Sequence, residues 1–278
     1  MPLTLMYITN SPAVALIAEK YGVDRIWIDL ETLGKEERQK GMNTVKSNHT
    51  IQDIEIISNI LTKAELLVRV NPWNETSISE IEAVIAAGAD RVMLPMWKSI
   101  DEVDMFLKIV NKRVHTTLLL ETKESVECLD AVLNNPLLEE IHIGLNDLHL
   151  SYGLTFMFEL LTNGVVEQIC EKCKSKNIPY GFGGIAKLGD GMLPAEKIVM
   201  EHYRLGSTIA ILSRSFCDNA KVDSIDEIDK IFKINMSVLR NYETQVETMN
   251  ENSFIQNRSF VIRCVNDIVR HIKEKNNV

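Results

Sequence analysis

Residues 65–96, ELLVRVNPWNETSISEIEAVIAAGADRVMLPM, contain the pattern that decides the fold. They open on an apolar run over 65–70 that is typical of a buried strand. A helical pattern over 79–87 follows and stops at Gly88, a residue type favoured just past a helix end. A second apolar run covers 91–96. A strand, a helix and a second strand in this order predict a βαβ unit with parallel strands.

The same alternation extends outward from this unit in both directions. Strands are predicted over 6–9, 25–31, 65–70, 91–96, 114–120, 140–144, 178–183 and 208–212, with helical patterns between them. The runs are apolar throughout, as expected for strands that are covered on both faces. Eight such units favour a closed (β/α)8 TIM-type barrel over an open doubly wound sheet, and no GxGxxG motif follows the first strand. We therefore predict an α/β barrel.

The remainder of the chain predicts additional C-terminal helices on the same domain. We interpret residues 1–278 as one barrel domain, with the barrel at about 3–220 and helices within about 224–275. The last helical pattern carries an apolar stripe: Phe254, Phe260, Val261, Val265, Ile268 and Ile272. Such a stripe needs a docking surface on the barrel or on a neighbouring subunit, so we expect a homo-oligomer.

Composition excludes several classes of partner. The chain has 278 residues, a net charge of −9 and no long run of Lys and Arg, which disfavours a nucleic-acid partner. There is no apolar run of about 18 residues and no basic segment at the start, so we expect no membrane partner and a cytoplasmic location. Cys170 and Cys173 lie within a helical pattern at 165–174, and we interpret them as helix residues rather than zinc ligands.

Charged residues stand at the ends of four predicted strands. Asp29 and Glu31 end the second strand, Arg69 the third and Glu121 the fifth, and Asp147 follows the sixth. The active site of this kind of barrel lies at the carboxyl ends of its strands, so these side chains are expected to converge. A charge directly after a buried run is costly unless it is paired or binds a metal.

Glu121 and Asp147 are the candidate metal ligands. They follow neighbouring strands, and two carboxylates without His or Cys suit Mg²⁺ or Mn²⁺. Gly144 permits a close approach to a ligand, and the backbone N–H groups of Asn146 and Asp147 can bind anionic oxygens. Arg69 offers a planar fork to a carboxylate or phosphate. The alternative is that all of these are ordinary strand-end charges, with Arg69 neutralising the acids.

Five segments in register carry a resemblance to a known family. They are WIDLE at 27–31, VRVNPWN at 68–74, AGADRVMLPM at 87–96, LET at 120–122 and IGLNDL at 143–148. Over roughly residues 5–215 the chain resembles the HpcH/HpaI aldolase and citrate lyase β-subunit family. The resemblance implies a modified barrel that forms or cleaves a C–C bond next to a 2-oxoacid, commonly pyruvate, through a metal-stabilised enolate.

The resemblance also implies roles for individual residues. Glu121 and Asp147 match the family's ligands for a divalent metal, and Arg69 matches the arginine that binds the carboxylate of the oxoacid substrate. Family members commonly form dimers, often within hexameric rings, and often exchange a terminal helix. The implied partners of this chain are therefore a small oxoacid and further copies of itself.

Three positions depart from the family pattern. The histidine that the aldolase branch has three residues after the aspartate matched by Asp29 is Thr32 here. An acidic residue expected before the turn at Gly88 is Ala86, and the glutamine two residues before Glu121 is Leu119. These changes leave the metal and oxoacid ligands in place and remove the usual group for proton transfer.

Proton transfer must then fall to another group. We assign catalysis to Arg69 with Asp29 and Glu31, while His49, His149 or a metal-bound water are alternatives. Two segments are weaker candidates for binding. Residues 181–184, which are rich in glycine, could line an anion pocket or make room for close packing. Residues 213–215 could contact the far end of a substrate. The leading hypothesis is a metal-dependent aldolase or lyase. The alternatives are an enzyme for phosphoenolpyruvate or other phosphorylated substrates, and a non-catalytic protein that binds small acids.

Overall fold

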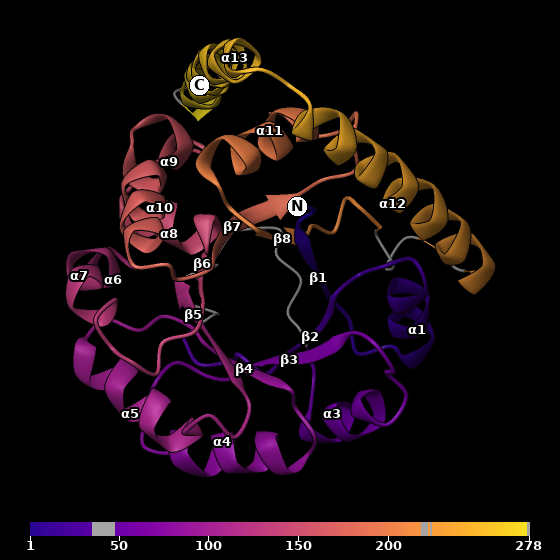
Figure 1. Cartoon of the computed structure of the whole chain (residues 1–278), viewed down its shortest axis with the longest axis vertical. Helices are drawn as coiled ribbons and strands as arrows, with labels where there is room; N and C mark the ends of the chain where they lie inside the picture. The colour runs from indigo at the N-terminus through magenta and orange to yellow at the C-terminus, as the bar shows by residue number, and fades with distance from the viewer. Residues whose placement is uncertain (35–47, 218–221, 223, 277–278) are drawn as a thin grey trace.

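The strands close into a ring, as the sequence predicts (Figure 1). The computed structural model describes residues 1–34, 48–217, 222 and 224–276. Eight parallel strands pair in chain order, and the eighth pairs with the first. They are β1 (Thr4–Ile8), β2 (Arg25–Asp29), β3 (Glu65–Arg69), β4 (Arg91–Leu94), β5 (His115–Leu120), β6 (Ile141–Ile143), β7 (Tyr180–Ile185) and β8 (Ile209–Leu212).

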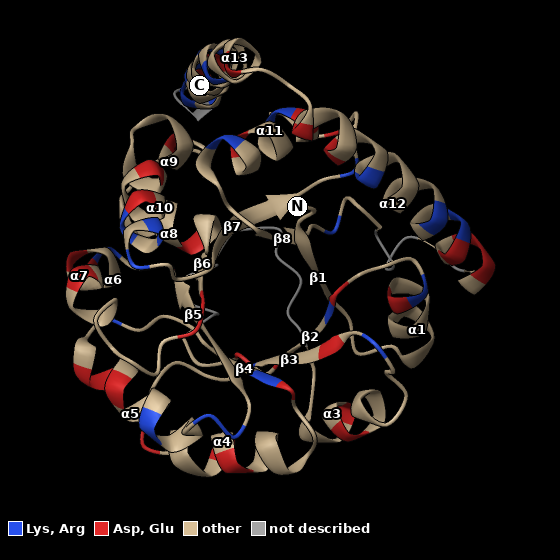
Figure 2. Ribbon diagram, in the orientation of Figure 1, with Lys and Arg blue, Asp and Glu red and all other residues tan. Residues whose placement is uncertain are grey.

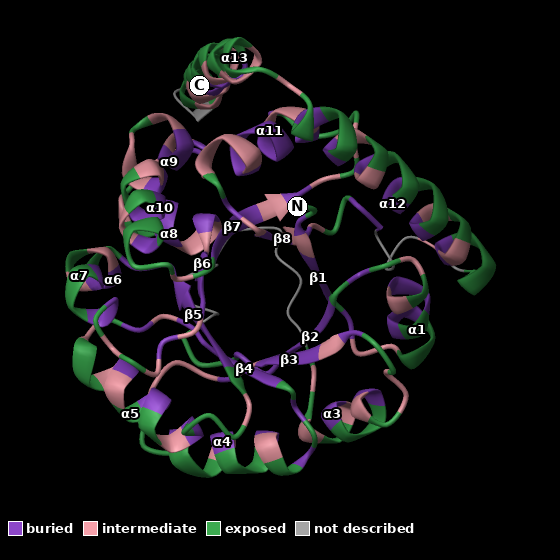
Figure 3. Cartoon of the chain, viewed as in Figure 1, coloured by how far each residue is buried: buried purple, intermediate pink, exposed green. Residues whose placement is uncertain are grey.

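Helices surround the ring and bury their inner faces against it. They are α1 (Pro12–Lys20), α3 (Ile51–Ser58), α4 (Ser77–Ala86), α5 (Ile100–Val110), α6 (Lys123–Glu127), α7 (Leu129–Val132), α8 (Leu145–Ser151), α9 (Glu159–Thr162), α10 (Val165–Ser175) and α11 (Ala195–Leu205). The strands are almost wholly buried, while the outer helix faces are exposed (Figure 3). Most of the charged positions accordingly lie on the outer helices (Figure 2). This arrangement explains the apolar strands and amphipathic helices of the sequence.

The barrel interior is packed with side chains. A layer of large apolar residues fills it: Met6, Trp27, Leu67, Met93, Leu119 and Ile209. Each of these six side chains is at most 2% exposed. The layer separates the two ends of the barrel, so that the end formed by the carboxyl ends of the strands, here called the mouth, has an apolar floor.

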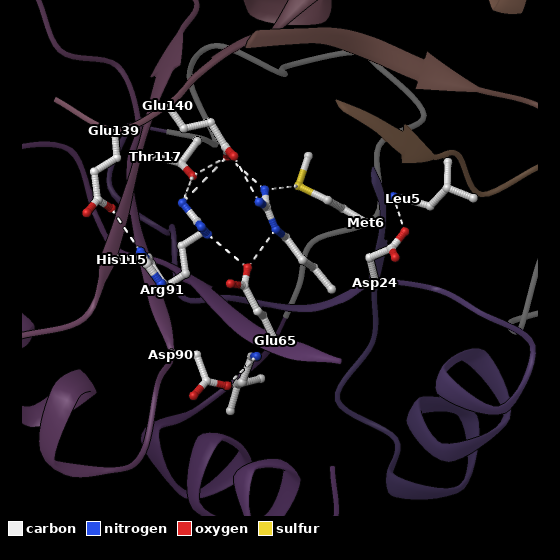
Figure 4. A network of polar contacts seen from close by, with 12 residues as sticks. Leu5, Met6, Asp24, Glu65, Asp90, Arg91, His115, Thr117, Glu139 and Glu140 are labelled. Atoms are coloured by element: carbon white, nitrogen blue, oxygen red, sulfur yellow. Dashed lines mark hydrogen bonds and ion pairs between the residues drawn. The ribbon is translucent and has the colours of Figure 1, made fainter. Parts of the chain in front are cut away.

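A layer of paired charges closes the opposite end of the barrel (Figure 4). Arg25 donates two hydrogen bonds to Glu140, at 2.7 and 2.8 Å, and a third to Glu65 at 2.8 Å. Arg91 reaches the same Glu65 oxygen at 3.1 Å, and Thr117 donates to Glu140 at 2.6 Å. These residues come from β2, β3, β4, β5 and the position before β6, so the network links strands across the interior. No pattern in the sequence predicted this network.

Two predicted elements differ in their boundaries. The helix expected behind the fifth strand is divided into α6 and α7, because the backbone leaves helical geometry at Cys128. The seventh strand runs over Tyr180–Ile185 and not over 178–183. Asn177 has a left-handed φ of 55° and Pro179 has no N–H to donate, so pairing with β6 begins at Tyr180.

The two predicted C-terminal helices are α12 (Ile225–Glu247) and α13 (Glu251–Asn276). α12 packs against α1 and α11, and α13 packs against α9 and α11 on the outside of the helix ring (Figure 1). Among the helices that the structure describes, none combines the length and apolarity needed to cross a membrane. Cys170 and Cys173 are free and buried in α10, as predicted, and burial raises the pKa of Cys173 to about 12.

Candidate active site

Asp29, Arg69 and Glu31 form a buried ion cluster at the mouth. Asp29 and Arg69 are register partners at the ends of β2 and β3. The guanidinium donates to both carboxylate oxygens of Asp29, from Nε at 2.8 Å and from Nη2 at 2.9 Å. Nη2 also lies 3.2 Å from Glu31 Oε2, and both acids are only 2% exposed. Both predicted catalytic acids, Asp29 and Glu31, therefore contact Arg69 directly.

Arg69 is held as a cation by its surroundings. Burial alone would lower its pKa, but the charges of Asp29, Glu31 and Glu121 and the hydrogen bonds that Arg69 donates to Asp29 outweigh burial and raise the pKa above its ordinary range. The guanidinium carbon also lies 5.1 Å from the ring centre of Trp27, a cation–π contact. Nε and Nη2 of Arg69 contact the two acids, so an incoming anion would bind the guanidinium through Nη1.

Glu121 follows β5 and is oriented by the backbone on both sides. Its Oε1 accepts the N–H of Met96 at 3.1 Å, and Met96 has a φ of 52°, a conformation that costs free energy for a residue with a side chain. On the other side, a Cβ added to Gly144 would lie 2.7 Å from Oε2 of Glu121. The absence of a side chain at Gly144 therefore leaves room for Glu121, whereas the sequence analysis expected it to leave room for a ligand.

Asp147 lies at the same mouth as Glu121. Gly144 precedes α8 and donates its N–H to Leu120 O at 2.9 Å, which joins the end of β6 to the end of β5. Asn146 and Asp147 belong to the first turn of α8 and are half-buried. The two candidate metal ligands therefore extend from neighbouring strand ends on one side of the barrel.

The donor chemistry at this edge fits a hard divalent cation. Four acidic side chains lie at the mouth: Asp29, Glu31, Glu121 and Asp147. The basic side chain that clusters with them is Arg69. Within the described part of the chain, no group of three or more His, Cys, Asp and Glu side chains is arranged to hold a metal. Glu121 and Asp147 would be the protein's ligands, with water or substrate completing the shell. Mg²⁺ commonly binds in this way, through one or two carboxylates.

A second set of polar residues supports the cluster, and two of them, Asn71 and Glu80, were not predicted from the sequence. Asp29 donates its backbone N–H to His49 Nδ1 at 2.9 Å, so the neutral form of this imidazole carries its proton on Nε2. Thr32 is turned toward Asn71, whose Oδ1 accepts from its backbone N–H at 2.9 Å. Asn71 in turn donates to Glu80 of α4 at 2.7 Å. The only sequence signal for Asn71 was its place directly after the third strand.

The remaining candidate residues lie outside this cluster. His149 is buried in α8, with Nδ1 3.2 Å from its own helix carbonyl at Leu145, which is a structural position. Ala86 ends α4, which leads into the first residue of β4 at the end opposite the mouth. Within this chain Ala86 therefore lies away from the mouth cluster, and its expected part in proton transfer stays a prediction. Leu119 belongs to the apolar layer beneath Glu121.

The two weaker candidates are also placed. A Cβ at Gly181 would lie 2.1 Å from Ile209 O, so this glycine allows β7 and β8 to pack closely and does not line an anion pocket. Ser213 and Ser215 contact each other through their hydroxyl groups at 2.9 Å in the turn after β8, and Arg214 between them is exposed.

Comparison with known proteins identifies the family. The model of the HpcH/HpaI aldolase/citrate lyase family matches residues 3–180, which is more than half of the chain. This chain belongs to the HpcH/HpaI aldolase/citrate lyase family. Members of this family are lyases of the aldolase and citrate lyase type and generally use divalent metal ions. The resemblance carried by the five sequence segments is thereby confirmed.

Solved structures share the fold at low sequence identity. A family protein from Burkholderia cenocepacia J2315 is 15% identical with a TM-score of 0.61, over 82% of this chain and 94% of that one. An HpcH/HpaI aldolase from Desulfitobacterium hafniense DCB-2 is 12% identical with a TM-score of 0.59, over 76% and 86%. A citrate lyase from Burkholderia xenovorans LB400 is 13% identical with a TM-score of 0.57, over 96% and 92%. None of the curated proteins searched matches this chain.

Proposed function

We propose that this protein is a metal-dependent lyase of the 2-oxoacid class, which forms or cleaves a C–C bond beside the oxo group of a pyruvate-type substrate. The observation that supports it is the buried set of Arg69, Asp29, Glu31 and Glu121 at the mouth, with Asp147 on the next strand end. Family membership makes this chemistry the leading choice for such a set.

Each residue has a part in the proposed reaction. Glu121 and Asp147 would hold the divalent ion, which supplies Lewis-acid stabilisation of the charge that develops on the 2-oxo oxygen. Arg69 binds a carboxylate oxygen of the substrate through Nη1. Asp29 keeps the guanidinium in place, because both of its oxygens accept from it.

We assign proton transfer at C3 of the oxoacid to Glu31. Asp29 uses both carboxylate oxygens to hold Arg69, at 2.8 and 2.9 Å, whereas Arg69 contacts Glu31 at Oε2, at 3.2 Å. In the forming direction, a proton leaves C3 to Glu31, C3 bonds to the carbonyl carbon of an aldehyde, and the aldehyde oxygen takes up a proton. The product is a 4-hydroxy-2-oxoacid, no oxidant is needed, and cleavage reverses these steps.

Exchange of the pyruvate methyl protons tests the proposal. The protein is incubated with pyruvate and Mg²⁺ or Mn²⁺ in deuterated water, and loss of the methyl signal is followed by proton NMR. We expect exchange that depends on the metal and falls at least about a hundredfold in Glu121→Gln, because one charge-stabilising group is lost. Glu124→Gln, the same change at an exposed position of α6, should exchange like the wild type.

Two results would refute the proposal. Tight binding of a phosphorylated ligand without any methyl exchange would favour an enzyme for phosphorylated substrates. Binding of pyruvate without exchange, equal in the presence and absence of metal, would favour a non-catalytic protein that binds small acids.

A further inference from the structure

Asn71 joins the segment that follows Glu31 to the end of β3. Its side-chain oxygen Oδ1 accepts the backbone N–H groups of Thr32 and Leu33, at 2.9 and 3.0 Å, and the Thr32 hydroxyl at 3.3 Å. Both of these residues are exposed, so burial of their side chains does little to hold the segment. The position of the backbone directly after Glu31 therefore depends on the amide of Asn71.

The surroundings of Asn71 fix the orientation of its amide. Backbone N–H groups can only donate, so the oxygen of the amide faces residues 32 and 33 and its nitrogen faces α4. Nδ2 donates to Oε1 of Glu80 at 2.7 Å, and the backbone N–H of Asn71 lies 3.2 and 3.3 Å from the two oxygens of the same carboxylate. A carboxylate only accepts, so Glu80 determines which side of the amide carries the nitrogen.

Glu80 is held in turn by a helix that packs on the barrel. It lies in the first turn of α4, and the next residue, Ile81, is fully buried, as is Val84 one turn further on. A continuous series of contacts therefore runs from the buried face of α4 through Glu80 and Asn71 to the backbone beside Glu31.

The position of this backbone matters for the reaction. Glu31 is buried, and its carboxylate lies 3.2 Å from Arg69, the residue assigned to the carboxylate of the oxoacid. A carboxylate that takes a proton from C3 of the bound substrate must stay within hydrogen-bond reach of it. A displacement of about 1 Å in a catalytic group can cost about a hundredfold in rate.

We infer that Asn71 is a positioning residue for Glu31, and that Glu80 orients the amide through which Asn71 acts. This inference rests on the proposed function, in which Glu31 moves the proton at C3. Substrate binding is assigned to Arg69 and to the metal ion. Loss of the Asn71 amide should therefore slow proton transfer and leave the binding of pyruvate nearly unchanged.

Asn71→Ala tests this separation of rate from binding. Methyl exchange is measured over a range of pyruvate concentrations with Mg²⁺ or Mn²⁺ in deuterated water. We expect kcat for exchange to fall at least about tenfold and KM to stay within about threefold of the wild type. Asn134→Ala, at an exposed position after α7, should keep both wild-type values. A higher KM with unchanged kcat, or no change in either, would overturn the inference.

An exchange of donor and acceptor tests the part of Glu80. Asn71→Asp places a second carboxylate opposite Glu80 and removes the amide donor, so kcat should again fall at least about tenfold. Adding Glu80→Gln to this variant supplies an amide that donates to the new carboxylate, and kcat should recover to within about fivefold of the wild type. Glu82→Gln, the same change at an exposed position of α4, should give no recovery.

The rescue also covers the case in which Asn71→Ala does not fold, which circular dichroism would show. The double variant exchanges one amide and one carboxylate and keeps an acceptor for the backbone N–H groups of residues 32 and 33. Equal rates in Asn71→Asp and in the double variant would show that the contact with Glu80 does not position Glu31.

The two proposals fail in different ways. Without methyl exchange of pyruvate in the wild type, the lyase function itself is refuted. With exchange present in the wild type and unaffected by the Asn71 variants, the function stands and the positioning role of Asn71 is lost.

Discussion

At the residue scale, His142 makes the stability of this protein sensitive to acid. The side chain lies in β6 with no exposed surface, and burial lowers its pKa from the ordinary 6.5 to about 4. Between about pH 4 and pH 6.5, His142 is therefore protonated in the unfolded chain and neutral in the folded chain. Stability is full above about pH 6.5 and falls as the pH decreases toward 4, by about 3 kcal/mol for this one group.

His142→Gln, which keeps a polar side chain but cannot be protonated in this range, should lose less stability over the same pH interval. The free energy of unfolding is measured by urea titration at several pH values between 7 and 4. His271→Gln, at an exposed position of α13, should show the wild-type pH dependence. Equal acid sensitivity of His142→Gln and the wild type would show that His142 is not the group responsible.

At the element scale, the charged layer links β2, β3, β4 and the start of β6. Glu140 is 4% exposed and accepts from both terminal nitrogens of Arg25. Glu140→Gln removes one of the two charged partners of the buried Arg25 guanidinium and leaves Glu65 as the other, and should lower the free energy of unfolding by about 3 kcal/mol. Chemical denaturation with circular dichroism measures this loss.

The matched control breaks an ion pair on the surface. Glu82 accepts two hydrogen bonds from Arg113 with the same geometry, but both side chains are largely exposed. Glu82→Gln should therefore cost less than about 1 kcal/mol, because solvent screens this pair. Similar losses in the two variants would mean that the buried layer contributes no more than a surface contact.

At the scale of the whole molecule, the C-terminal helices leave apolar surface uncovered. Ile234 and Val238 of α12 are 60% and 48% exposed, and Ile255 of α13 is 56% exposed. Such surface is stabilised by association, so we expect a homo-oligomer of at least a dimer. Light scattering coupled to size-exclusion chromatography gives the mass. A monomeric mass at micromolar concentration would contradict this expectation, and Ile255→Glu should reduce the mass if α13 forms the interface.

The barrel could be predicted from the sequence because its signals are local. Apolar runs, amphipathic helices and stop residues such as Gly88 depend on neighbours along the chain, and parallel strands alternating with helices allow few arrangements. The same reasoning placed Arg69, Glu121 and Asp147 at one mouth, because the carboxyl ends of all eight strands meet there. It singled out Gly144 as a position where a side chain would be in the way, although the neighbour found there is Glu121 and not a ligand.

Only the tertiary structure decided which side chains meet. The bidentate grip of Asp29 on Arg69, the Met96 N–H on Glu121 and the bond from Asp29 to His49 join residues that are 20 to 40 positions apart. These contacts depend on strand register and on where each loop returns, and no local pattern encodes either. The charged layer joins Arg25 of β2 to Glu140 before β6 across the interior of the closed ring. Ring closure is a property of the whole chain, so no segment of the sequence reveals it alone.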